Sequence, residues 1–123
     1  IDRICVGSFS DKRLRHIRSE FGPGLCTSMG PQEVIRLVLS SNTLLPISPS
    51  LHALIAQVPV RQGPIPVVTR RSIARAHQLG LQVHVWTIDD PSEIGRLLDL
   101  GVDGIMSDDT KALKDVFTAR NLW

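Results

Sequence analysis

The residues best placed to do chemistry lie where an apolar run gives way to an acidic loop. Residues 82–90 read QVHVWTIDD. Side chains alternate along a strand, so His84 and Trp86 share one face. Trp86 stands at the carboxyl end of the predicted strand, where ligands bind in open α/β sheets and in (β/α) barrels. Trp86 is therefore either part of a ligand pocket or a large core residue that caps the strand.

The other histidines and the two cysteines give little support for a catalytic or metal centre. His16 and His77 fall on predicted helices and His52 in a loop, and each is expected to be structural or exposed. Cys5 and Cys26 lie in two separate strand-like runs and are expected to be buried thiols. A disulfide is geometrically possible only if those strands are neighbours. The sequence has no CxxC pair, so nothing indicates a structural zinc site.

Composition excludes several classes of protein. The formal charge of +2 is too weak to indicate a nucleic-acid partner, and the 4% of aromatic residues, with no Tyr, argues against a base-stacking surface. No apolar run reaches the roughly 18 residues of a transmembrane helix. The chain starts Ile-Asp-Arg, with neither an initiator Met nor a signal peptide. We therefore expect a globular cytoplasmic protein without a transmembrane segment.

The hydrophobic pattern predicts five strand–helix units. Besides the stretch that begins at Gln82, strands are predicted at residues 3–9, 25–28, 53–59 and 102–108. Helix starts are predicted at Ser10 or Asp11, Pro31, Thr69 and Asp90. This alternation favours a parallel sheet with right-handed crossovers. The chain has no GxGxxG and no P-loop, so the usual nucleotide-binding folds lack their signature.

Local features carry further expectations. Gln57 is polar near the carboxyl end of the third strand, so it faces either a pocket or a neighbouring backbone. Residues 61–66 are expected to form a loop, and residues 40–51, with two prolines, a variable connection. The first helix carries basic residues that are expected to form a solvated face: Lys12, Arg13, Arg15 and Arg18.

The motifs around the fourth and fifth strands resemble those of a known family. Residues 85–89 read VWTID and residues 101–108 read GVDGIMSD; they look like that family's VWTV(N/D) strand and its GVDGIITD segment. Residues 76–81, AHQLGL, resemble its AH..GL helix end, and residues 7–9, GSF, resemble its SF strand. In this order, over nearly the whole chain, the motifs are similar to the C-terminal portion of glycerophosphodiester phosphodiesterases.

The resemblance implies a TIM (β/α) barrel that hydrolyses glycerophosphodiesters to glycerol 3-phosphate and an alcohol with a divalent metal, Mg or Ca. Family members use an early HRG histidine, an ExD carboxylate pair, a second histidine and a Glu in an E(I/L)K strand. A metal held by carboxylates neutralises the phosphate, and two histidines exchange protons with the attacking and leaving oxygens. The sequence contains none of these motifs. Catalytic residues and metal ligands are therefore expected outside this chain.

Carried over residue by residue, the resemblance implies that Phe9 and Trp86 line the substrate pocket. Asp108 matches an aspartate that closes the last strand, for which we expect a structural role. Ser107 stands where the family has Thr, and residues 109–110 replace a tail that normally contains Pro. The loop after the last strand is therefore expected to differ locally from the family pattern.

The expected fold class is α/β, a partial TIM (β/α) barrel of about five consecutive βα units with a parallel sheet. Residues 1–123 would form a single domain, the C-terminal part of a phosphodiesterase-like barrel. Such a chain is expected to be inactive alone and prone to self-association through its open sheet edges.

Two other readings remain beside the phosphodiesterase. One is a non-catalytic half-barrel that binds a phosphoryl ligand or a partner chain. The other is a free-standing five-stranded regulator domain, which is disfavoured because the third strand offers Gln57 and no phosphoacceptor Asp.

Overall fold

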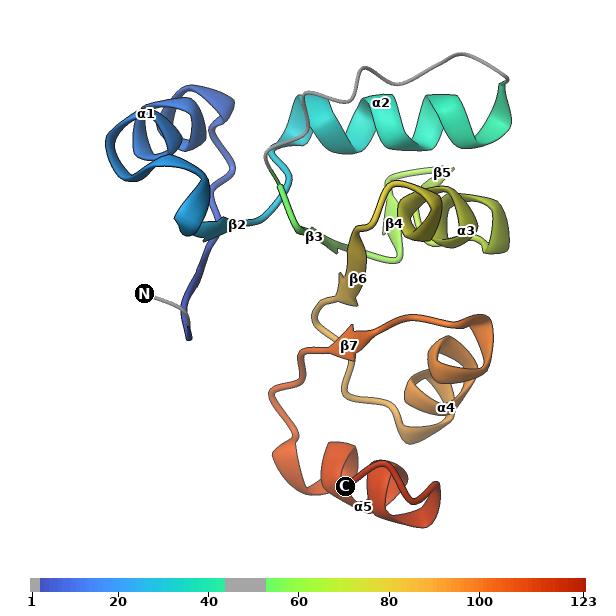
Figure 1. Cartoon of the computed structure of the whole chain (residues 1–123). Helices are drawn as coiled ribbons and strands as arrows, with labels where there is room; N and C mark the ends of the chain where they lie inside the picture. Colours follow the sequence, from blue (N-terminus) through green and yellow to red (C-terminus); the bar gives the residue numbers. More distant parts are fainter. Residues whose placement is uncertain (1–2, 44–52) are drawn as a thin grey trace.

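Strands and helices alternate along the chain. A computed structural model describes residues 3–43 and 53–123 (Figure 1). The elements in chain order are β1 (Cys5–Val6), α1 (Asp11–Phe21), the 3₁₀ turn η1 (Gly22–Gly24), β2 (Cys26–Thr27), α2 (Pro31–Asn42), β3 (Ile55–Val58), β4 (Arg61–Gln62), β5 (Ile65–Pro66), α3 (Arg70–Gln78), β6 (Gln82–Val85), α4 (Pro91–Leu100), β7 (Gly104–Ile105) and α5 (Thr110–Ala119). Within these ranges no helix is long and apolar enough to cross a membrane.

The main strands pair in parallel, and their order in the sheet follows their order in the chain. β1 pairs with β2, and β3 pairs with β6, which pairs with β7. A parallel bridge between Ser28 and Ile55 joins the two groups. The resulting order β1-β2-β3-β6-β7, with a helix after each strand, is the order of consecutive units in a (β/α) barrel.

One face of this sheet packs against the helices. Ala56 and Val85 are 0% exposed, and Val58 and Val83 beside them are 3% exposed. These side chains join one core cluster with Ile73 and other buried residues of the helices. Figure 1 shows the helices spread in an arc along this outer side of the strands. The helices of the predicted strand–helix units therefore bury this face of the sheet.

The opposite face, which we call the inner face, is only half-buried. The strand register places these residues on it: Cys5, Cys26, Ile55, Gln57, Gln82, His84 and Gly104. All of them are intermediate or exposed, although Ser28, which the register also places on this face beside Ile55, is buried. Every residue of β3 and β6 on the other face is buried. A parallel sheet is normally covered on both faces. The polar side chains on this face therefore mark it as the side from which a ligand or further chain can approach.

Side-chain caps fix where the helices start. Three predicted caps each accept a hydrogen bond from the backbone N–H three residues later: Ser10, Thr69 and Asp90. Pro31 begins α2 as predicted. Gly101, with φ at 103°, ends α4 in the left-handed region that favours glycine. Since each helix starts just after a strand ends, these caps also fix the loops at the carboxyl edge of the sheet.

The structure corrects one predicted loop and shortens four predicted strands, two of them most strongly. Residues 61–66 form a small antiparallel hairpin, because β4 pairs with β5 around Gly63, whose φ is 56°. The strands predicted at 3–9 and 102–108 are paired only over Cys5–Val6 and Gly104–Ile105. Most of the predicted 40–51 connection lies outside the described residues, and α2 continues through Asn42.

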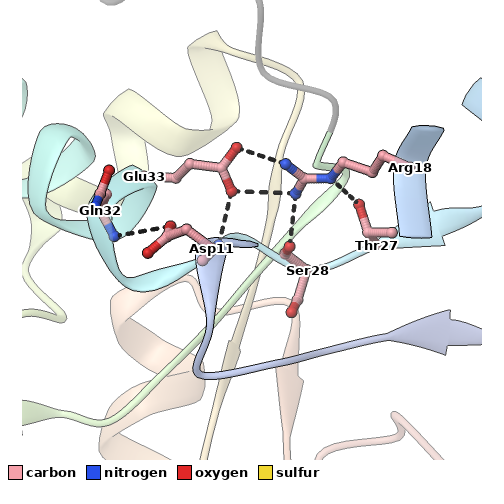
Figure 2. A network of polar contacts seen from close by, with 7 residues as sticks. Asp11, Arg18, Thr27, Ser28, Gln32 and Glu33 are labelled. Carbon is pink, nitrogen blue, oxygen red and sulfur yellow. Dashed lines mark hydrogen bonds and ion pairs between the residues drawn. The ribbon is translucent and has the colours of Figure 1, made fainter. Parts of the chain in front are cut away.

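The prediction that Arg18 belongs to a solvated basic face is wrong. Its guanidinium lies between α1, β2 and α2, and the side chains of Arg18 and Glu33 are only 13% and 15% exposed. Arg18 donates to both carboxylate oxygens of Glu33, at 2.9 and 3.1 Å, to Thr27 Oγ1 at 2.9 Å and to the Ser28 carbonyl at 3.0 Å (Figure 2). Glu33 also accepts from the Gly30 N–H at 2.7 Å. One side chain therefore ties α1 to the end of β2 and the start of α2.

Candidate functional site

The structure brings Phe9 and Trp86 together. Trp86 directly follows β6, and its N–H donates to the Val58 carbonyl at 3.2 Å, so the residue stands at the carboxyl edge of the sheet. Phe9 follows β1 at the same edge. The two rings meet edge to face, with centroids 5.9 Å apart and planes at 77°. The two residues that the family resemblance places in a substrate pocket thus form one aromatic pair.

The position of this pair shows that the sheet is strongly curled. β1 and β6 are not neighbours, because β2 and β3 lie between them in the strand order. Two aromatic rings can meet across that separation only if the strand ends bend toward each other on the inner side. Phe9 is 85% exposed and makes this contact at the edge of an open surface. Trp86 is half-buried beside it.

Gln57 supplies a second contact across the curl. A Cβ placed on Gly7 would lie 3.0 Å from Gln57 Oε1 and 3.0 Å from Ser28 Oγ. Gln57 belongs to β3 and Gly7 follows β1, so the amide reaches over β2 to the backbone of the first unit. Of the two alternatives left open for Gln57, the neighbouring backbone is the one observed. A side chain at position 7 would push this polar group away.

His84 lies against a glycine of the adjacent strand. It is paired in register with Gly104, and a Cβ there would stand 2.7 Å from His84 Cδ2. The ring Nε2 lies 3.2 Å from Gln82 Oε1. Burial lowers the pKa of His84 below its usual value, and the Asp103 carboxylate acts in the opposite direction. The imidazole is thus a neutral polar group on the inner face near neutral pH.

Asp89, and not Asp108, organises the loop after the last strand. Asp89 Oδ1 accepts from Ser107 Oγ at 2.8 Å, from the Asp108 N–H at 2.8 Å and from the Asp109 N–H at 3.3 Å. These hydrogen bonds, from Ser107 first, lower the pKa of Asp89. Asp108 contributes its backbone and leaves its side chain exposed. Ser107 keeps the hydroxyl that a Thr would offer, and Asp109 caps α5 without a Pro.

His77 has a structural role, as expected. Its Nε2 lies 2.8 Å from Asp103 Oδ2, and the same carboxylate oxygen accepts from the Val83 N–H at 2.7 Å. Two motif segments that are far apart in the sequence are thereby joined across β6. His16 is exposed on α1, and His52 lies outside the described residues.

Cys5 and Cys26 are neighbours, as a disulfide would require, but both are free thiols. They are half-buried on the inner face and not fully buried as predicted. Burial, helped by the hydrogen bond and charge of the neighbouring Cys26, raises the pKa of the Cys5 thiol to about 12. A protonated thiol is a poor nucleophile and a poor metal ligand, so Cys5 offers no thiolate near neutral pH.

The described residues do not fit the divalent metal that the motifs imply. Within residues 3–43 and 53–123, no three His, Cys, Asp or Glu side chains lie close enough together to hold an ion. Two carboxylates at the carboxyl edge are used otherwise, because Asp89 holds the loop after β7 and Asp90 caps α4. No step of a reaction is therefore assigned to a metal held by these residues.

Sequence reasoning missed three residues that shape this edge of the sheet. Arg18 and Asp89 each act through partners that are distant in the sequence, and no spacing rule connects them. Position 104 is occupied by glycine because the ring of His84, on the neighbouring strand β6, leaves no room for a Cβ.

Comparison with known proteins assigns the chain to a family. Residues 3–112 match the model of the glycerophosphoryl diester phosphodiesterase family. The chain is also 33% identical, over 129 aligned residues, to the protein named Probable glycerophosphodiester phosphodiesterase 2 of Mycobacterium tuberculosis (strain ATCC 25618 / H37Rv). That alignment covers 99% of this chain and 47% of the relative. The chain thus spans about half the length of the curated relative that it matches.

Two solved structures share the fold. One, from Silicibacter pomeroyi DSS-3, is described as a putative glycerophosphoryl diester phosphodiesterase; it has a TM-score of 0.69 and 24% identity, covering 98% of this chain and 39% of its own. The other, a glycerophosphodiester phosphodiesterase from Parabacteroides distasonis ATCC 8503, has a TM-score of 0.60 and 19% identity, covering 93% of this chain and 43% of its own. The fold is thus α/β and TIM-barrel-like. With the motifs around β6 and β7 and the match over residues 3–112, this chain belongs to the glycerophosphoryl diester phosphodiesterase family.

Proposed function

We propose that residues 1–123 form a single unit, the C-terminal part of a TIM (β/α) barrel, whose complete form hydrolyses glycerophosphodiesters to glycerol 3-phosphate and an alcohol. Family membership and the sequential order of the parallel strands support this proposal. A half-open inner face is what such a part would have, because the interior of a closed barrel is filled by side chains from all its strands.

The observation that carries the substrate-binding role is the contact between Phe9 and Trp86 at the carboxyl edge. In barrels the loops at this edge form the active site. The two rings present an apolar surface beside an open, polar inner face, and this suits the glycerol carbons or the alcohol of a phosphodiester more than its phosphate. We propose that the pair binds and orients this part of the substrate and keeps water from it.

The groups that neutralise the phosphate and transfer protons are proposed to come from outside this chain. A divalent metal, Mg or Ca, would supply charge neutralisation in the complete enzyme. This chain's contribution would be the aromatic pair and two separate sets of hydrogen bonds, one around Arg18 and one around Asp89, which fix the surrounding loops. We therefore expect the chain alone to release no glycerol 3-phosphate.

A chimera tests the proposal. The segment of the Mycobacterium tuberculosis relative that aligns with this chain would be replaced by it, and release of glycerol 3-phosphate from glycerophosphocholine would be followed with Mg or Ca. We expect hydrolysis, with kcat/KM reduced at least about tenfold by Trp86→Ala or Phe9→Ala, since each removes an apolar contact of about 1.5–3 kcal/mol. The control is Phe21→Ala, an exposed Phe on α1 that lies outside the pair.

Binding by the unmodified chain gives an independent measurement. With Trp123→Phe as background, Trp86 is the remaining indole, and its fluorescence would be titrated with glycerophosphocholine. We expect a saturable change that Phe9→Ala abolishes and Phe21→Ala preserves. Binding by a folded chimera that hydrolyses nothing would favour the alternative, a non-catalytic half-barrel that binds a phosphoryl ligand. If neither protein binds, the pocket assignment of Phe9 and Trp86 is wrong.

A further inference from the structure

A second cavity lies away from the aromatic pair, between the C-terminal end of α2 and one face of α3. Its volume is about 320 Å³. The α2 side is lined by Ser40, Ser41 and Thr43, and the α3 side by Arg71, Arg75 and Gln78. Neither the family motifs nor the proposed phosphodiesterase reaction uses these residues. The cavity is large enough for a small metabolite rather than for a single ion.

The α3 side of the cavity is strongly cationic. Arg71 and Arg75 are four residues apart, so they lie on the same face of the helix one turn from each other. α2 and α3 together contain one carboxylate, Glu33, and Arg18 already pairs with it. No acidic side chain of these two helices therefore neutralises the two arginines.

Arg75 is incompletely satisfied by its surroundings. Its Nη1 donates to Gln78 Oε1 at 3.2 Å, whereas its Nε is buried and has no acceptor among the described residues. A buried donor without an acceptor destabilises the state that contains it. Arg75 also lines the cavity, so an anion bound there would give the part of the guanidinium that faces the cavity acceptors besides Gln78.

The α2 side offers hydrogen-bond acceptors. The hydroxyls of Ser40, Ser41 and Thr43 donate to backbone carbonyls of α2 at 2.9, 2.7 and 3.0 Å. Because each hydroxyl proton is already used, its oxygen can only accept from a ligand. The same bonds cover carbonyls of the last turn of α2, which would otherwise repel an anion at this helix end.

We propose that this cavity binds a phosphorylated polyol, with its phosphate on Arg71 and Arg75 and its hydroxyls donating to the α2 oxygens. Two guanidinium groups suit the several acceptor oxygens of a phosphate better than a single carboxylate. The hydroxyls of the ligand would donate hydrogen bonds to the side-chain oxygens of Ser40, Ser41 and Thr43, which can only accept. This site stands apart from the Phe9–Trp86 pair and does not rest on the proposed hydrolysis.

The test is isothermal titration of the chain with glycerol 3-phosphate, inorganic phosphate and glycerol at low ionic strength. The double variant Arg71→Gln/Arg75→Gln should lose at least about tenfold in affinity for glycerol 3-phosphate, since it removes charge-assisted hydrogen bonds. The matched control, Arg36→Gln/Arg70→Gln, removes the same charge from α2 and α3 at positions that do not line the cavity. It should keep the parent affinity.

Three further variants keep the result decisive. Ala74→Glu places a carboxylate in the lining at an exposed helical position and should abolish binding without loss of helicity by circular dichroism. Ser41→Ala/Thr43→Val should weaken glycerol 3-phosphate and leave inorganic phosphate unchanged. Phe9→Ala/Trp86→Ala separates this site from the aromatic edge and should have no effect.

The proposal has defined failures. It is overturned if the parent chain binds no phosphate probe, if both arginine double variants lose the same affinity, or if only Phe9→Ala/Trp86→Ala abolishes binding. Equal affinity for inorganic phosphate and glycerol 3-phosphate would overturn the role of the α2 hydroxyls. A loss confined to Phe9→Ala/Trp86→Ala would, by contrast, support substrate binding at the aromatic edge.

Discussion

Gly104 is a residue whose replacement should directly disturb the packing between β6 and β7. An added Cβ would lie 2.7 Å from His84 Cδ2, so Gly104→Ala forces the ring or the strand to move. We expect a loss of about 1–3 kcal/mol in the free energy of unfolding, the usual cost of overpacking. Urea denaturation, monitored by circular dichroism at one protein concentration, measures it.

Two controls isolate the cause of that loss. Gly24 has no atom within 4 Å of an added Cβ, so Gly24→Ala should change stability little. In the double variant His84→Ser/Gly104→Ala the ring is absent, and most of the loss should disappear. A loss that persists at full size in the double variant would contradict the steric explanation.

His84 should also make stability depend on pH. Its pKa is lowered in the folded state, first by burial, from an ordinary value of 6.5. As the pH falls below about 6.5 the unfolded chain takes up the proton before the folded chain does, so stability falls until the folded pKa is passed. Thermal unfolding at pH 7.5 and 5.5 should therefore show a drop in Tm that His84→Gln reduces. His16, His52 and His77 remain in both proteins, so a drop of equal size in His84→Gln would exclude this histidine as its source.

The family resemblance pointed to Phe9 and Trp86, and their rings meet because both residues follow parallel strands whose carboxyl ends share one edge; their role in substrate binding stays a prediction. They could not find the partners of Arg18, whose donors reach residues 9 to 15 positions away through tertiary packing. A basic residue on an amphipathic helix looks solvated until the neighbouring elements are placed. The same limit applies to Asp89, whose partners lie 18 to 20 residues away.

At the scale of elements, the Arg18 network joins α1, β2 and α2. Arg18→Met keeps much of the side chain's volume and leaves the Glu33 carboxylate without this partner in a mostly buried place. We expect a loss of about 3 kcal/mol in the free energy of unfolding, typical of breaking one side of a buried ion pair. Chemical denaturation of the purified chain gives the value.

The matched control for this prediction is Arg15→Met on the same helix. Arg15 is exposed, so the substitution should change stability by no more than about 0.5 kcal/mol. Arg18→Met/Glu33→Gln should recover part of the loss, because the remaining group is no longer charged. Equal effects of Arg15→Met and Arg18→Met would show that general helix charge, and not the buried pair, is responsible.

Elements were predictable where one side chain or one backbone conformation decides the outcome. Ser10, Thr69 and Asp90 cap the helices they were expected to cap, since a hydroxyl or carboxylate there satisfies a free N–H. The hairpin β4–β5 was missed because its strands are two residues long and exposed, so no hydrophobic alternation marks them. The extents of β1 and β7 were overestimated because apolar runs continue beyond the residues that pair.

At the scale of the whole molecule, we expect the two outer strands, β1 and β7, to promote self-association of the chain. In the described part of the chain, β1 and β7 each pair with a single strand, and the apolar side chain of Ile4 beside β1 is 57% exposed. Unpaired strand edges are sites of intermolecular pairing. We expect sedimentation velocity to show self-association that grows with protein concentration.

Ile4→Lys should weaken this association, because a charge beside an edge strand opposes pairing with a second chain. Ile35 is also 57% exposed but lies on α2, so Ile35→Lys is the matched control and should leave the association constant unchanged. A chain that stays monomeric at every concentration would contradict the expectation. So would an association that both lysines weaken equally.

The class of fold was accessible from the sequence because βα alternation dictates parallel strands and the motifs supplied the order. The curl of the sheet was not accessible from the sequence, because it depends on contacts between non-adjacent strands, such as the contact of Gln57 with Gly7. Nor could the pattern show that one face is packed and the other half-open. That distinction depends on which strands are present to cover the inner face.

Because spatial order follows chain order, β1-β2-β3-β6-β7, each strand that leaves the ribosome finds its partner already synthesised. The pairing of β3 with β6 spans the β4–β5 hairpin and α3, yet both partners are present as soon as β6 has been synthesised. Every new strand–helix unit can dock on the previous one, so few long loops must close at once and folding can proceed vectorially during synthesis.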